Sequence, residues 1–90
     1  MRGELVIVRD FSGKALLRRV WNADERAVYI TNDEQFERLL ADEEALLPVG
    51  FPREDVFEYV PSVVELLGQE QELVDWSRLI RWEEKATISN

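Results

Sequence analysis

Carboxylates are the residues of this sequence that could do chemistry, because its 90 residues include 19 Asp and Glu but no His and no Cys. Six of them gather in one short stretch: Asp33, Glu34, Glu37, Asp42, Glu43 and Glu44. Two carboxyl groups that face each other across a cleft can transfer protons if one of them has a raised pKa, and six to eight converging oxygens can hold Ca²⁺. Acids strung along one exposed helix do not converge, and no EF-hand spacing is present. We therefore expect either a solvated helix face or a contact surface for a basic protein, with no metal and no cofactor.

The hydroxyl nucleophiles lack the groups that would activate them. Ser and Thr have no His to act as a base, and a Ser–Lys pair would need Lys14 or Lys85, neither of which lies in a recognisable motif. Gly13 and Gly50 are isolated, so no glycine-rich phosphate loop is present. The absence of Cys also removes thiolate catalysis. These features predict a protein that is not an enzyme.

Charge is distributed unevenly along the chain, whose formal net charge is −8. Residues 1–31 hold six basic and four acidic residues, whereas residues 32–90 hold five basic and 15 acidic ones. A surface of this sign repels the phosphates of a nucleic acid. We expect no direct nucleic-acid binding, unless Arg18, Arg19 and their neighbours form a local basic patch, and instead a protein partner with a basic surface.

Aromatic residues near the C-terminus form the second candidate contact surface. On a helix from about residue 69 to 84, Trp76 and Ile80 would share one face, Leu79 would extend it, and Trp82 would lie on the other side. Trp82 either packs within its own chain or anchors a partner, and Trp is enriched among interface hot spots. The pattern makes Trp76, Leu79 and Trp82 candidate partner-binding residues, and it makes a homodimer possible.

Three strands are predicted in the first third of the chain. Residues 4–9, 15–21 and 27–31 are rich in Val, Ile and Leu, and short polar turns separate them. Such spacing is typical of an antiparallel meander.

Helices are predicted in the middle and at the end of the chain. One is expected over residues 33–43, with its start left open because Thr31 and Glu34, or Asn32 and Gln35, both have capping-box spacing. Two more are expected at the C-terminus, over residues 61–67 and 69–84.

Residues 46–60 are expected to be extended and irregular, with one helical turn after Pro52 and a short strand over 56–60. The segment Phe51-Pro52-Arg53-Glu54-Asp55-Val56 resembles the closing segment of SH3-like barrels, in which a Phe-Pro pair ends one strand, a single 3₁₀ turn follows, and a Val begins the last strand. Elsewhere the resemblance covers the first 60 residues only in outline. It implies that Phe51 and Val56 are buried.

The same resemblance argues against recognition of Pro-rich ligands. Peptide-binding SH3 domains carry an aromatic residue in the turn where this sequence has Asp55. Their first loop is rich in aromatic residues, whereas here only Phe11 could serve. The resemblance therefore implies an SH3-like scaffold with a different surface.

The expected fold is α+β: a small curved antiparallel sheet, an SH3-like barrel, with one inserted helix and a C-terminal helical pair. Residues 1–60 would form the β-rich part, with the inserted helix at 33–43, and residues 61–85 would pack on it as C-terminal helices. The longest apolar run, Leu5–Val8, is far shorter than the ~20 residues of a membrane span. We therefore expect no membrane contact and a cytoplasmic location.

The expected function is that of a non-catalytic, acidic protein–protein interaction or regulatory module. The alternative is an acidic nucleic-acid mimic that inhibits a DNA- or RNA-binding protein, as phage-type anti-defence proteins do.

Overall fold

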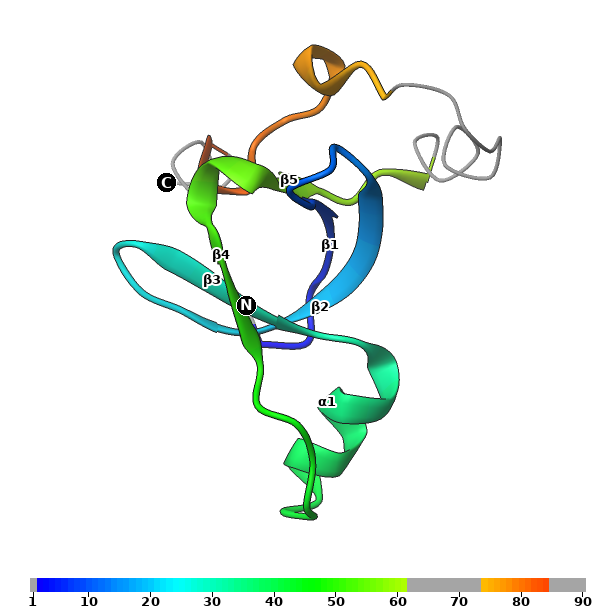
Figure 1. Cartoon of the computed structure of the whole chain (residues 1–90), viewed down its shortest axis with the longest axis vertical. Coiled ribbons are helices and arrows are strands. Elements are labelled where there is room, and N and C mark those ends of the chain that lie inside the picture. The colour runs from blue at the N-terminus through cyan, green and yellow to red at the C-terminus, as the bar shows by residue number, and fades with distance from the viewer. Residues whose placement is uncertain (1, 62–73, 85–90) are drawn as a thin grey trace.

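The computed structural model describes residues 2–61 and 74–84 and contains one five-stranded antiparallel sheet with a helix at one end (Figure 1). The strands lie in the order β4-β3-β2-β1-β5. In chain order the elements are β1 (Leu5–Arg9), β2 (Ala15–Ala23), β3 (Ala27–Thr31), α1 (Asp33–Leu40), β4 (Val49–Pro52), the 3₁₀ turn η1 (Arg53–Asp55), β5 (Val56–Glu58) and the 3₁₀ turn η2 (Trp76–Arg78). The predicted α+β class, with a small curved sheet and an inserted helix, is confirmed, and the sheet is open, with β4 and β5 as its two edges.

Strand β1 lies in the sheet with apolar neighbours on both faces, which explains its unbroken run of apolar residues. Val6 and Val8 point to one face, where they join a core cluster completed by Val20, Val28, Ile30, Val56 and Trp82. Ile7 points to the opposite face, where it packs with Phe57 and the half-buried Trp76 and Leu79. Side chains that alternate along a strand thus build two clusters from one segment.

Strand β2 carries a bulge that joins the sheet to α1. The pairing of β2 with β3 shifts register between Val20 and Asn22, so Trp21 is the extra residue. The Trp21 ring meets the ring of Phe36 edge-on, with 5.7 Å between the centroids. Because Phe36 belongs to α1, this contact holds the helix against the sheet.

Helix α1 begins at the second of the two predicted starts. The Asn32 side chain accepts a hydrogen bond from the Gln35 backbone N–H at 2.8 Å, and the Gln35 side chain accepts one from the Asn32 N–H at 3.2 Å. The helix ends at Leu40 and not at residue 43 as predicted. Asp42 adopts φ of 58°, and the Glu43 N–H donates to the Arg38 carbonyl at 2.8 Å, so the left-handed residue turns the chain out of the helix.

The SH3-like closing segment has the predicted local form. Phe51 and Pro52 end β4, η1 makes a single 3₁₀ turn, and Val56 begins β5. Val56 is fully buried, and Phe51 is half-buried against the core cluster. The resemblance implied a strand that ends at the Phe-Pro pair, and β4 is that strand, whereas composition alone predicted an irregular stretch because Gly50 and Pro52 are poor strand formers.

The prediction of a long helix over residues 69–84 is wrong for residues 74–84, which the structure describes. There the chain makes the turn η2, becomes extended, pairs Arg81 with Phe57 of β5, and starts a helical turn at Trp82. The other predicted C-terminal helix lies outside the described residues except for Pro61, which is helical. Among the described residues no helix has the length and apolar character needed to cross a membrane.

Candidate functional site

The six predicted carboxylates lie on α1 and on the turn that follows it, and all six residues are exposed. Two of those on the helix are held by cations: Asp33 accepts from Arg19 Nε at 2.8 Å, and Glu34 lies 3.4 Å from Arg38 Nε. No group of three or more Asp and Glu in the described part of the chain converges as metal ligands would. The arrangement is a charged surface, and we refer to these six residues as the acidic surface.

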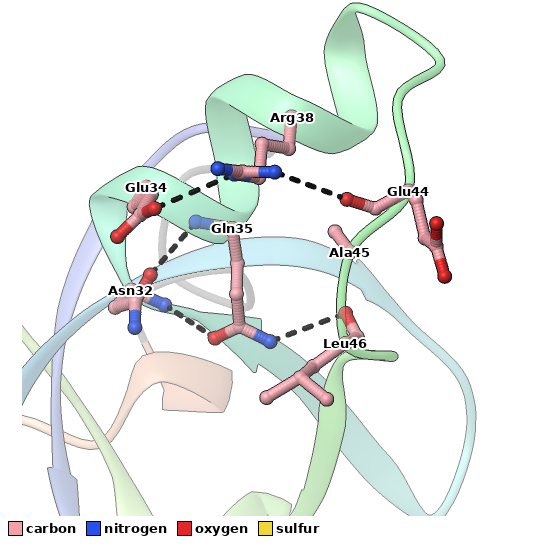
Figure 2. A pocket seen from close by; sticks show the side chains of 7 residues that line it. All are labelled: Asn32, Glu34, Gln35, Arg38, Glu44, Ala45 and Leu46. Carbon is pink, nitrogen blue, oxygen red and sulfur yellow. Dashed lines mark hydrogen bonds and ion pairs between the residues drawn. The ribbon is translucent and has the colours of Figure 1, made fainter.

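Figure 2 shows how side chains of α1 fix the segment that leads into β4. The Gln35 Nε2 donates to the Leu46 carbonyl at 3.2 Å, and the Arg38 Nη1 donates to the Glu44 carbonyl at 3.4 Å. A pocket of about 270 Å³ lies among these groups and is also lined by Glu34. Because Gln35 and Arg38 bind backbone carbonyls here, their side chains hold the segment beside α1.

This segment exposes three apolar side chains that the sequence analysis did not select. Leu46 is 78% exposed, Leu47 is 81% exposed, and Val49 is 56% exposed. We refer to Leu46, Leu47 and Val49 as the apolar strip. Glu34, Glu44 and Leu46 line the same pocket, so the apolar strip borders the acidic surface. The signal in the sequence was an apolar run, Leu46-Leu47-Pro48-Val49, that follows neither a helical nor a strand period.

The predicted aromatic surface is folded against the sheet. Trp76 and Leu79 are half-buried beside Ile7 and Phe57, and the Trp76 ring lies 4.9 Å from that of Phe57. Trp82 is only 6% exposed and belongs to the core cluster on the other face. Of the two alternatives that the sequence left open, packing of Trp82 within its own chain is therefore confirmed, and the extended residues before it turn its side chain into the core. A partner contact through this ring would require it to leave the core.

A second pocket, of about 390 Å³, lies over the Trp76 side of the sheet and contains two arginines, Arg9 and Arg81. The Arg9 guanidinium is held by Asp55 at 2.8 Å and stacks 5.2 Å from the centre of the Trp76 ring. Ser77 also lines the pocket, and its hydroxyl donates to the carboxylate of Asp75, the residue that caps η2, at 2.6 Å. The contacts of Arg9 fasten η2 to the sheet.

Among the described residues, the groups with perturbed pKa values are two carboxylates in the hairpin turns and one tyrosine of β3, and none of them lines either pocket. Hydrogen bonds from Ser12 and from the Lys14 backbone lower the pKa of Asp10. The Arg26 and Ala27 backbone N–H groups and the Tyr29 hydroxyl lower that of Asp24. The same contact with Asp24 raises the pKa of Tyr29.

These shifts have a structural meaning. Each carboxylate satisfies the backbone donors of an exposed turn, which favours its ionised form. The shifts therefore describe turns and not a general acid or base.

Comparison of the chain with protein-family models, with curated proteins and with solved structures gives no match. The acidic surface and the apolar strip are the features of the described residues that bear most directly on function.

Proposed function

We propose that this protein is a non-catalytic interaction module that binds a basic protein through its acidic surface and its apolar strip. The observation that carries the proposal is the exposure of Leu46 and Leu47, at 78% and 81%, beside a cluster of carboxylates. Apolar patches rimmed by charged residues are typical of protein–protein contacts. Within the chain these two side chains contribute little to the core.

The apolar strip would supply the affinity of the complex. A Leu or Val side chain that becomes fully buried stabilises the buried state by about 1.5–3 kcal/mol. Gln35 and Arg38 already hold the backbone of the segment, so ordering it on binding costs less conformational entropy than for a free loop.

The acidic surface would supply attraction and orientation. Residues 32–49 carry six carboxylates against one arginine, Arg38. A cluster of one sign accelerates the encounter with a partner of the opposite sign, and salt weakens this effect. The partner is accordingly a protein with lysines and arginines around an apolar contact.

The nucleic-acid mimic remains the second candidate, since it too would bind a basic protein. A mimic depends on its carboxylates alone, because the groove that it fills is made for phosphates. The apolar strip favours contact with a surface that has apolar groups of its own. Competition separates the two: added DNA or RNA would displace a mimic from its target.

The test is capture of a partner by the purified protein, followed by a titration of that partner. The Leu46→Asp/Leu47→Asp double variant removes the apolar strip, and Phe11→Ser is the matched control, because Phe11 is fully exposed on the β1–β2 turn. We expect a basic protein to bind the wild type and the Phe11→Ser variant and to lose at least tenfold in affinity for the double variant. Equal affinity for all three proteins would overturn the proposal.

A further inference from the structure

Strand β4 has an open outer side next to the apolar strip. Its inner side pairs with β3, from Ala27 opposite Pro52 to Ile30 opposite Val49. No described residue pairs with its outer side, because β4 stands at one end of the strand order. An unpaired strand edge presents backbone donors and acceptors to any extended chain that reaches it.

The hydrogen bonds of the β2–β3 turn show which groups of β4 face outward. The Ala27 N–H donates to the Asp24 side chain at 2.9 Å, and the Ala27 carbonyl accepts from the Asp24 N–H at 2.9 Å. Ala27 therefore faces β2, and the alternation along a strand turns Val28 and Ile30 toward β4. Their partners in the register are Phe51 and Val49, which face β3 in return.

The backbone groups of Gly50, between Val49 and Phe51, and of Pro52, after Phe51, consequently face outward. Gly50 offers both an N–H and a carbonyl at the open edge, whereas Pro52 offers only a carbonyl. Proline at an edge position with its nitrogen toward solvent is the arrangement that sheets tolerate. The open edge thus has a single donor, which restricts pairing to registers centred on Gly50.

From this geometry we infer that an extended segment of the basic partner adds to the outer side of β4 as a further strand, in register with Gly50. The inference rests on the proposed function and specifies how the contact is made. Apolar side chains of the added strand cover Leu47 and Val49, and its lysines or arginines meet Glu43 and Glu44, which are separated from the strip by one alanine. Main-chain hydrogen bonds supply affinity in such complexes, and alternate side chains supply specificity.

A second copy of this chain is the less favourable occupant of the same edge. A two-fold axis through Gly50 would place Pro52 of each copy opposite Pro48 of the other, and Pro48 has no N–H to donate to the Pro52 carbonyl. It would also bring two acidic surfaces together, each with six carboxylates. Charge complementarity therefore selects a basic strand.

Amide NMR with synthetic peptides tests the inference on the whole protein. The probe is an eight-residue peptide of alternating lysine and valine, and the control replaces each lysine with glutamate. We expect the lysine peptide to shift the amide signals of residues 46–52 and to slow exchange of the Gly50 amide at least tenfold. The glutamate peptide should do neither, and Leu47→Asp should weaken the lysine peptide at least tenfold.

The outcomes separate this inference from the proposed function. If the lysine peptide binds but leaves Gly50 exchange unchanged and shifts α1 instead, strand addition is wrong while the acidic contact stands. Absence of binding at millimolar peptide also overturns strand addition, and the capture experiment then decides the proposed function on its own. Protection of Gly50 that rises with protein concentration, without peptide, would assign the edge to a second copy and overturn the inference.

Discussion

The two edges of the sheet are finished in different ways. At the β5 edge the chain returns and covers the strand: the Glu58 N–H donates to the Ile80 carbonyl at 2.8 Å, and Arg81 pairs with Phe57. At the β4 edge no described residue returns, and the strand ends in proline beside three exposed apolar side chains. A covered edge contributes to stability, whereas an uncovered edge leaves backbone donors and acceptors unpaired.

The residue that follows the covered edge shows what holds it in place. Trp82 comes directly after Arg81, and its ring lies in the core cluster. The Trp82 Nε1 donates to a Glu4 carboxylate oxygen at 3.3 Å, and the Arg53 guanidinium stacks 5.3 Å from the centre of its ring. Within the described residues the apolar strip beside β4 has no comparable anchor, since Leu46 and Leu47 are both more than three-quarters exposed.

Removal of the anchor should have the largest effect on stability. Truncation of a buried aromatic side chain typically costs about 3–5 kcal/mol, so Trp82→Ala should lower the free energy of unfolding by that amount. Urea denaturation measures the change, and Trp76→Ala is the control on a half-buried ring of the opposite face. A loss below about 1 kcal/mol in Trp82→Ala would show that the covered edge does not depend on this ring.

Acid should have an intermediate effect, through the two hairpin turns. The pKa values of Asp10 and Asp24 are lowered from 3.8 in the folded protein. A lowered folded-state pKa contributes stability above the unfolded value, and this contribution is lost as the pH falls through the folded-state pKa. The wild type should therefore lose stability as the pH falls below 3.8, and the Asp10→Asn/Asp24→Asn variant should lose less over the same range.

Urea unfolding at several pH values between 2 and 6 measures this difference. Asp33→Asn serves as the control, because Asp33 lies on α1 outside both turns. Parallel pH profiles for the wild type and the double variant would show that the turn carboxylates are not responsible for the acid sensitivity.

The smallest effect on stability is expected at the open edge. Leu46→Ser and Leu47→Ser should each change the free energy of unfolding by less than about 0.5 kcal/mol, since substitutions of exposed residues outside special features rarely do more. The same variants should weaken partner binding. If either variant unfolds with a loss above about 1 kcal/mol, the apolar strip is part of the fold and not a contact surface.

The sequence predicted the elements that follow from local patterns. The apolar run of β1 and the Phe-Pro turn each carry a short-range signal, and each was confirmed. Of the two capping boxes that the sequence left open, the structure has that of Asn32 and Gln35. Composition alone did not predict β4, because Gly50 and Pro52 are poor strand formers. Both residues are tolerated in this strand because β4 pairs with β3 on one side only. Tertiary pairing, not local propensity, makes this segment a strand.

The prediction of a helix in the C-terminal segment was wrong for a related reason. Trp76, Leu79 and Trp82 fit a helical spacing, but the structure divides them between the two faces of the sheet by way of an extended stretch. Periodicity cannot reveal that residues 80–81 pair with β5, because this pairing depends on a strand more than 20 residues away in sequence.

The exposure of the apolar strip could not be predicted either, since a sequence does not show which leucines are buried by residues distant in the chain. The acidic surface was predicted as a set of residues, and its role in binding stays a prediction.

Amide hydrogen exchange in the free protein tests the difference between the two edges most directly. The account predicts that the Gly50 amide exchanges at nearly the rate of an unprotected amide, while its neighbours Val49 and Phe51, which face β3, and Glu58, which donates to Ile80, are protected. These neighbouring amides experience the same solvent and pH, so they serve as internal controls. A Gly50 amide as protected as that of Glu58, in dilute protein without a partner, would contradict the account.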